Sequence, residues 1–264
     1  MKRKLIVVIK ALFLLYIALC VGLYFFQEHL IFFPQKLDRT HEFYFTEDFE
    51  EFTFRTSDGV FLNGLLFKSD SSKGLIFYLH GNAGSLSSWG NVSSAYLALH
   101  YDVFILDYRG YGKSEGTISS QNQLFQDNQM IYDVLKKKYQ EKDIIILGYS
   151  IGTGLASKLA SDNSPRKLIL QAPYYSLTDM MRQRFSLIST FILKYKFATN
   201  EYLKNCKMPI VIFHGDRDDV IHNDASLRLK AQFNNSIKLV ILKGQGHNGM
   251  TENKAYKQEL RKVL

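Results

Sequence analysis

The chain has only two cysteines among its 264 residues, Cys20 and Cys206. The first lies in a hydrophobic segment and the second lies far downstream, so we expect no disulfide framework, and the cysteines do not identify a redox compartment. Cysteine and histidine at metal-ligand spacing are also lacking. We therefore expect no metal and no other cofactor.

Strong charge is lacking as well. The net charge is +8, of which four charges belong to Lys2, Arg3, Lys4 and Lys10, which leaves +4 for the rest of the chain. This balance permits contact with an anionic membrane surface, but no basic stripe with interleaved aromatic residues predicts nucleic acid as a partner. Internal repeats and low-complexity segments are absent. The 46% apolar content is enough for the sizeable core of one α/β domain.

The N-terminal segment is the longest hydrophobic run. Leu5 to Phe26 is apolar except for Lys10, and as a helix it spans about 33 Å against a hydrocarbon core of about 30 Å. We predict that residues 1–26 form an uncleaved membrane anchor. The basic residues Lys2, Arg3 and Lys4 place its N-terminus in the cytoplasm and the rest of the chain outside, which is the periplasm if the protein is bacterial.

Three alternatives to an anchor stay open. A cleaved signal peptide lacks its A-x-A-like site here, because bulky residues close the segment. A lipoprotein signal ending at Cys20 would need a small residue in place of Leu19, and a buried helix is the third alternative. Residues 27–48 are expected to form a membrane-proximal arm, whose apolar stretch Leu30 to Pro34 either packs on the domain or lies in the bilayer interface.

Strands and helices alternate through residues 49–264, which we expect to form one domain. Phe52–Arg55 and Val60–Phe67 alternate in polarity around a Ser-Asp-Gly turn and predict an antiparallel hairpin. The alternation after it predicts a mostly parallel sheet with helices on both faces. The expected strands are Leu75–Leu79, Val103–Leu106, Asp143–Leu147, Lys167–Gln171, Pro209–Phe213 and Ile237–Leu242, and the expected helices are Ser85–Leu99, Gln121–Tyr139, one starting near Leu155, Asp224–Phe233 and Thr251–Val263.

The most informative stretch is residues 143–154. A short β-branched strand is followed at once by Gly148-Tyr149-Ser150-Ile151-Gly152 and then by a helical pattern. Strand, G-x-S-x-G and helix are the context of a nucleophile elbow, in which a sharp turn lifts the serine above the sheet at a helix N-terminus. Gly148 and Gly152 supply the lack of bulk that such a turn needs. The alternative is a glycine-rich turn with an ordinary N-cap serine at Ser150.

Two later strands end in an acid and a histidine. Asp218 follows the strand at 209–213, and His247 follows the strand at 237–242. A serine hydroxyl needs a base, so His247 is the candidate base and Asp218 the candidate residue that orients it. Asp216 and Asp219 share the loop with Asp218 and stay possible as the acid. The order serine, acid, histidine is that expected of an α/β-hydrolase.

A developing oxyanion would need two N–H donors. The backbone N–H of Ile151, next after the serine, is one candidate, and that of Asn82, in the loop after strand 75–79, is the other. Two further strand-end histidines, His80 and His214, each precede a glycine in a tight turn, and we interpret both as structural.

These motifs together resemble the α/β-hydrolase superfamily, and in particular membrane-anchored serine hydrolases related to the serine aminopeptidase family, which includes monoacylglycerol lipases and depalmitoylases. The resemblance covers nearly the whole chain. It implies an α/β-hydrolase fold with a small cap insertion, and a triad of Ser150, Asp218 and His247. Family members often have aspartate after Gly-His-Asn, whereas this chain has Gly249. The matching segments are His80 to Gly84, Asp107 to Ser114, Gly148 to Gly152, His214 to Val220 and Gly246 to Asn248.

The sequence therefore predicts a membrane-anchored serine hydrolase that cleaves esters or thioesters of acyl chains, with a small-molecule or lipid ester as substrate. An amidase or peptidase, and a non-catalytic scaffold that keeps the fold, are the alternatives. Residues 174–206 occupy the place of a cap, in which Asp179 and Glu201 are the only acids. Its large apolar residues either line an acyl pocket or pack in a helix core: Tyr174, Tyr175, Met180, Met181, Phe185 and Phe191. Neither oligomeric state nor head group follows from the sequence.

Overall fold

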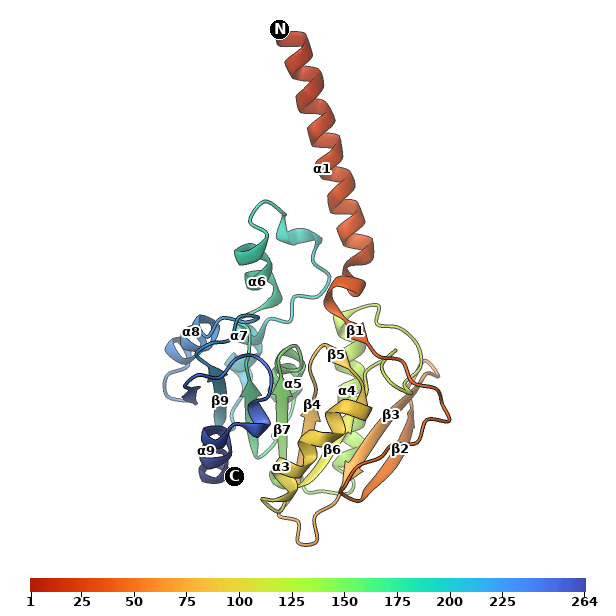
Figure 1. Ribbon diagram of the computed structural model, residues 1–264, viewed down its shortest axis with the longest axis vertical. Coiled ribbons are helices and arrows are strands. Elements are labelled where there is room, and N and C mark those ends of the chain that lie inside the picture. The colour runs from red at the N-terminus through yellow and green to blue at the C-terminus, as the bar shows by residue number, and fades with distance from the viewer.

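The centre of the molecule is an eight-stranded β-sheet, seen in a computed structural model that describes every residue from 1 to 264 (Figure 1). The strand order is β10-β9-β8-β7-β4-β6-β3-β2. The strands are β2 (Phe49–Arg55), β3 (Phe61–Phe67), β4 (Leu75–Leu79), β6 (Asp102–Leu106), β7 (Ile144–Tyr149), β8 (Lys167–Gln171), β9 (Ile210–Gly215) and β10 (Ile237–Leu242).

The sheet is parallel from β10 to β6, while β3 runs antiparallel to both β6 and β2. The predicted hairpin and the predicted mostly parallel sheet are therefore both confirmed. In parallel strands the carboxyl ends meet at one edge of the sheet, and this edge faces the upper part of Figure 1, where β7 ends.

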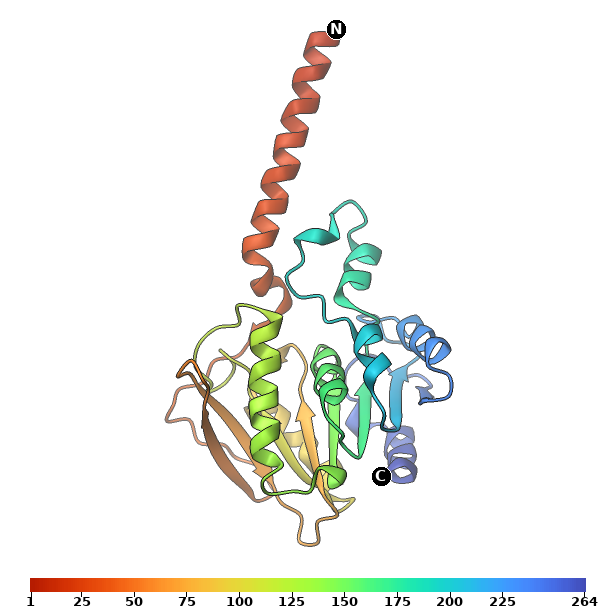
Figure 2. The ribbon, with the colours of Figure 1, turned by 180° about the vertical axis from the view of Figure 1, so that it is seen from behind.

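Helices cover both faces of the sheet, as the apolar strands require. In β4, Leu75, Phe77 and Leu79 belong to one core, and Ile76 and Tyr78 belong to the other. A strand buried on both faces is expected to be continuously apolar, and β4 is. Figures 1 and 2 show one layer on each face. One layer contains α4 (Gln121–Leu135), α5 (Gly152–Asp162) and α8 (Asp224–Gln232), and the other contains α2 (Leu86–Trp89), α3 (Ser94–Leu97) and α9 (Lys254–Val263).

The helix expected at 85–99 is broken into three pieces, with the 3-10 helix η1 (Gly90–Ser93) between α2 and α3. A Cβ on Gly90 would lie 2.2 Å from the ring of Phe45. The chain after α1 thus packs closely over this region. The helix expected at 121–139 ends earlier, at Leu135, and the one expected at 251–263 begins with the 3-10 helix η5 (Met250–Glu252).

The N-terminal helix α1 (Lys2–Ile31) continues five residues beyond the predicted end at Phe26. It is long and apolar enough to cross a membrane, and only Cys20 and Gln27 are buried in it. The alternative of a buried core helix is therefore wrong. The residues that follow partly pack on the domain, because Phe32 is buried and β1 (Phe33–Pro34) pairs in parallel with β5 (Ala83–Gly84).

Residues 174–206 connect β8 to β9 without a strand, as expected. They form α6 (Leu177–Arg184), the 3-10 helix η3 (Thr190–Ile192), α7 (Thr199–Tyr202) and the 3-10 helix η4 (Leu203–Asn205). We call residues 177–195 the cap segment. Figures 1 and 2 both show it beside α1, rising from the sheet on the same side as the helix.

Candidate active site

Ser150 lies in the turn between β7 and α5, with its backbone in the left-handed region at φ 52°. Steric crowding explains why both Gly148 and Gly152 are glycines. A Cβ on Gly152 would lie 2.1 Å from the carbonyl oxygen of Leu79, and a Cβ on Gly148 would lie 2.5 Å from that of Gly152. The strained serine and the two close approaches are what a nucleophile elbow requires.

The structure brings Ser150, His247 and Asp218 together from three loops. Nε2 of His247 lies 3.0 Å from Oγ of Ser150, and Nδ1 of His247 lies 2.7 Å from Oδ2 of Asp218. All three side chains are buried. Asp216 and Asp219 are exposed, and Oδ1 of Asp216 accepts the N–H of Gly244. Of the three acids on this loop, Asp218 is the one in contact with the histidine.

Asp218 is held in its ionised form. Burial opposes ionisation, but His214, His247 and the N–H of Ile221 more than offset it, so the pKa of Asp218 lies well below its usual range. His214 is fully buried, with Nε2 3.3 Å from Oδ2 of Asp218 and 2.8 Å from the carbonyl oxygen of Ile221. The interpretation of His214 as structural misses this contact, although His214 and Asp218 are the histidine and the aspartate of the local pattern H-G-x-x-D.

Tyr149 holds the loop that carries His247 through a hydrogen bond to its backbone. The hydroxyl of Tyr149 donates a hydrogen bond of 2.5 Å to the carbonyl oxygen of His247. The other strand-end histidine, His80, is fully buried and does not line the cavity that contains Ser150, and its carbonyl oxygen accepts the hydroxyl of Tyr108 at 2.9 Å. His80 therefore supports the loop that follows β4.

The N–H groups of Ile151 and Asn82 donate no hydrogen bond to the protein, and both residues line the cavity that contains Ser150. The backbone on the C-terminal side of Asn82 is anchored, because its carbonyl oxygen accepts the N–H of Phe33 at 2.8 Å and the hydroxyl of Tyr111 at 2.7 Å. Two free donors beside a nucleophile are the arrangement that stabilises an oxyanion.

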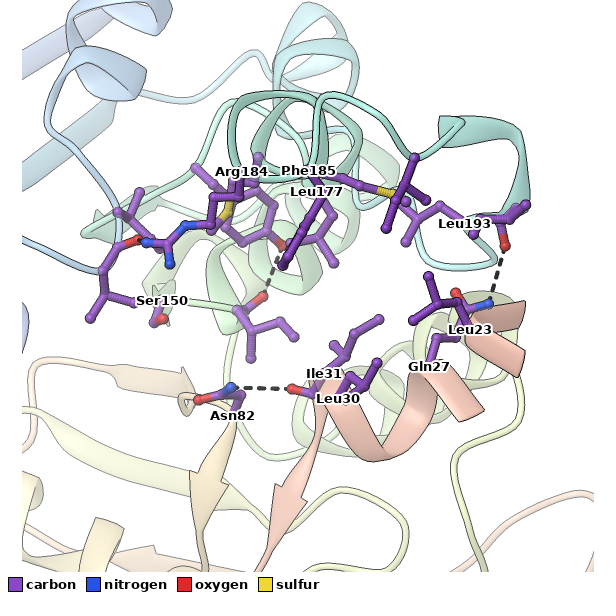
Figure 3. A pocket seen from close by; sticks show the side chains of 18 residues that line it. Leu23, Gln27, Leu30, Ile31, Asn82, Ser150, Leu177, Arg184, Phe185 and Leu193 are labelled. Carbon is purple, nitrogen blue, oxygen red and sulfur yellow. Dashed lines mark hydrogen bonds between the residues drawn. The ribbon is translucent and has the colours of Figure 1, made fainter. Parts of the chain in front are cut away.

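The cavity above Ser150 has a volume of about 420 Å³ and is mostly apolar (Figure 3). Of the six candidate cap residues, four line it, whereas Tyr175 and Phe191 do not. The hydroxyl of Tyr175 bonds to Gln232, and Phe191 is 83% exposed. The lining residues are Leu23, Gln27, Leu30, Ile31, Asn82, Ser150, Ile151, Tyr174, Leu177, Met180, Met181, Arg184, Phe185, Ile188, Ile192, Leu193, Val220 and Ile221.

One group of lining residues is not expected from the sequence. Leu23, Gln27, Leu30 and Ile31 belong to α1, and Figure 3 shows them across the cavity from Leu177 and Phe185 of the cap segment. Their spacing of four, three and one residues is that of a single helix face. This spacing was available in the sequence, but nothing local distinguishes a pocket wall from a lipid-facing surface.

The topology and the serine turn define an α/β-hydrolase fold. The chain belongs to the family described as serine aminopeptidase, S33, whose profile matches residues 70–201. This confirms the resemblance inferred from the motifs.

The chain is also similar to two curated proteins. The chain is 32% identical to protein bem46 of Schizosaccharomyces pombe over 67% of its own length and 63% of that protein. It is 30% identical to the lysophosphatidylserine lipase ABHD12 of Mus musculus over 57% of its own length and 43% of that protein. Both matches thus span less than two thirds of the relative. An esterase structure from Pyrococcus furiosus shares the fold, with a TM-score of 0.69 at 18% identity, covering 88% of this chain and 94% of that one.

Proposed function

We propose that this protein is a serine hydrolase, anchored in a membrane by α1, that cleaves carboxylic esters or thioesters of acyl chains. The observation that carries the proposal is the contact of Ser150 with His247, at the floor of an apolar cavity. The printed name of the ABHD12 relative, a lipase, supports a lipid ester as the substrate class. In this arrangement the N-terminus is cytoplasmic and the domain lies outside.

The geometry supports a mechanism through an acyl-enzyme. Oγ of Ser150 attacks the acyl carbon while Nε2 of His247 takes its proton. Asp218 orients the imidazole through Nδ1 and stabilises the charge that it gains. The developing oxyanion is held by the N–H groups of Asn82 and Ile151. His247 then passes its proton to the departing alkoxide or thiolate, which leaves the acyl group on Ser150.

Water completes the cycle. It attacks the acyl carbon of the acyl-enzyme while His247 takes a proton from it, and the proton returns to Oγ of Ser150 as the carboxylic acid departs. The apolar walls of the cavity accommodate the acyl chain, and its burial supplies binding free energy of about 25 cal/mol per Å² of apolar surface.

A peptidase for free amino termini is the less favoured activity. Recognition of an ammonium group calls for a carboxylate, and none lines the cavity, in which Arg184 is the charged residue. The two acids of residues 174–206 are engaged elsewhere. Asp179 pairs with Arg228 at 2.7 Å, and Glu201 pairs with Lys204 at 2.7 Å.

The test is hydrolysis of p-nitrophenyl esters, from acetyl to palmitoyl, by the full chain in nanodiscs. We expect activity in the wild type, loss in Ser150→Ala, and no change in the control Ser161→Ala on the outer part of α5. A fluorophosphonate probe should label the wild type and the control but not Ser150→Ala. A folded wild type that neither hydrolyses esters nor takes the label would support the non-catalytic scaffold instead.

A further inference from the structure

The C-terminal third of α1 is built into the cavity, not merely joined to the domain. Leu23, Gln27, Leu30 and Ile31 form one side of the cavity, and residues of the cap segment form the other. The neighbouring Phe25 and Phe26 point away from it and are about two thirds exposed, at 65% and 64%. One helix therefore presents one face to the substrate site and another to its surroundings.

Polar contacts fix α1 against the cap segment. The side chain of Gln27 is buried, donates to the carbonyl oxygen of Ile192 at 3.2 Å and accepts the N–H of Lys194 at 2.8 Å. Glu28 pairs with Nζ of Lys194 at 3.0 Å and accepts the hydroxyl of Tyr195 at 3.0 Å. A buried amide with its partners satisfied at this position holds the wall in place.

A second contact lies much farther along the helix. The hydroxyl of Tyr16 donates to the carbonyl oxygen of Leu187 at 3.1 Å. Tyr16 precedes Gln27 by eleven residues, which is about 16 Å along a helix axis. The cap segment at Leu187 therefore lies beside the apolar middle of α1. It extends well beyond the part of α1 that contains Gln27 and Glu28.

The tip of the cap segment, residues 185–191, exposes three large apolar side chains, with Ser186, Ser189 and Thr190 between them. Phe185, Leu187 and Phe191 are 56%, 87% and 83% exposed, beside the exposed apolar side chains of α1. Large uncovered apolar side chains on a protein surface mark an interaction site. These side chains lie beside the apolar part of α1, which is long and apolar enough to cross a membrane. The partner that fits them is therefore the hydrocarbon of the same bilayer.

The stretch of α1 between the two contacts, from Ile17 to Phe26, has apolar side chains apart from the hydroxyl of Tyr24. Cys20 within it is buried, and Leu23 within it reaches the cavity. An acyl chain that moves along this stretch of α1 would therefore meet mainly apolar side chains on the helix side.

We propose that α1 is a wall of the acyl pocket as well as an anchor, and that membrane-resident acyl esters enter laterally between α1 and the cap segment. The proposal rests on the proposed function, and it specifies the substrates as lipids drawn from the bilayer that holds the enzyme. A soluble ester reaches the same serine without using this route.

The experiment uses the full chain in phosphatidylcholine vesicles. A long-chain fluorogenic acyl ester that does not exchange between vesicles is placed either in the same vesicles or in a second, protein-free population, and p-nitrophenyl butyrate is the soluble substrate. We expect the long-chain ester to be hydrolysed only when it shares the vesicle with the enzyme. Equal rates in the two arrangements would overturn lateral entry.

Two substitutions test the wall. Leu23→Trp should lower long-chain hydrolysis at least about tenfold more than it lowers butyrate hydrolysis. Ala18→Trp, at an exposed position on α1, is the control for adding an indole to the helix. The proposal that α1 is a wall of the acyl pocket would be refuted if Leu23→Trp and Ala18→Trp lost equal activity. It would also be refuted if Leu23→Trp lost equal activity on the long-chain ester and on butyrate. Fluorophosphonate labelling shows that each variant is folded.

The cap tip is tested separately by Leu187→Asp, with Leu227→Asp on α8 as the exposed-leucine control. We expect only Leu187→Asp to lower long-chain hydrolysis. Failure of the proposed function looks different, because butyrate hydrolysis would then not depend on Ser150. Butyrate hydrolysis that depends on Ser150, without any hydrolysis of the long-chain ester in the same vesicle, would reject the lateral route and leave the serine mechanism intact.

Discussion

The side-chain amide of Asn82 donates a hydrogen bond to the carbonyl oxygen of Ile31, with 3.1 Å between nitrogen and oxygen. Ile31 is the last residue of α1, and Asn82 follows β4. The bond ties the loop that carries a free N–H group to the end of the N-terminal helix. The position of that N–H group therefore depends on where α1 ends.

Asn82→Ala removes this bond and keeps the backbone N–H. We expect kcat for a soluble ester to fall about fivefold, because one intramolecular hydrogen bond contributes about 1 kcal/mol, and we expect KM to change little. Steady-state kinetics in nanodiscs would measure both. The control is Asn91→Ala, which removes a side-chain bond to the carbonyl oxygen of Ser88 outside the cavity. An Asn82→Ala enzyme with wild-type kcat would contradict the positioning role.

Asp218→Asn should lower kcat by about three to four orders of magnitude, because an amide no longer fixes the imidazole tautomer of His247. Fluorophosphonate labelling should slow in parallel, since it requires the same activated serine. Asp219→Asn, on the same loop but exposed, is the matched control and should keep full activity. A larger loss in Asp219→Asn than in Asp218→Asn would reassign the acid.

Asp218 also makes stability depend on pH. Its pKa is lowered in the folded protein from an ordinary value of 3.8, so its contribution is complete above that value and is lost as the pH falls toward the lowered pKa. The difference in free energy of unfolding between wild type and Asp218→Asn should thus shrink between pH 5 and pH 3. Urea denaturation in detergent at both pH values measures it. A difference that stays constant would contradict the lowered pKa.

Gly152→Ala should destabilise the fold. Its Cβ would lie 2.1 Å from the carbonyl oxygen of Leu79, and forcing extra volume into such a site costs about 1–3 kcal/mol. Thermal unfolding should begin at a lower temperature, and ester hydrolysis should be lost. For Gly246→Ala the nearest heavy atom is 3.8 Å away, so this variant should unfold like the wild type. Equal melting temperatures for all three proteins would exclude the steric argument.

The sequence predicts the parts of this molecule that rest on local patterns. The strand before Ser150, the glycines at 148 and 152 and the helix after them form one continuous stretch, so the elbow is recognisable without any tertiary information. The loop of Asp218 contains three acids, and the sequence alone selects Asp218 as the partner of His247 only through the family pattern. The structure makes the choice by distance, since Asp218 is the one that contacts His247.

The parts that the sequence does not predict depend on residues far apart in the chain. Gln27 binds the carbonyl oxygen of Ile192, which lies 165 residues away in the chain. No local sequence periodicity predicts such a pair. The break in the helix expected at 85–99 has the same origin, because Phe45 packs where a side chain on Gly90 would be. Helix ends are also set by such contacts, and α1 ends at Ile31 where β1 begins to pair with β5.

The long separation between Gln27 and its partners has a consequence for biosynthesis. A ribosome makes Gln27 first, and at about 5–20 residues per second the carbonyl of Ile192 follows on the order of 10 s later. During that interval the carboxamide of Gln27 has only the carbonyl oxygen of Tyr24 as a partner, because Ile192 and Lys194 have not been made, and the nascent helix has no cap segment to pack against. The cavity beside Ser150 can thus form only after the cap segment and Ile221 have been made, so a chain that terminates before them would keep α1 without gaining this cavity.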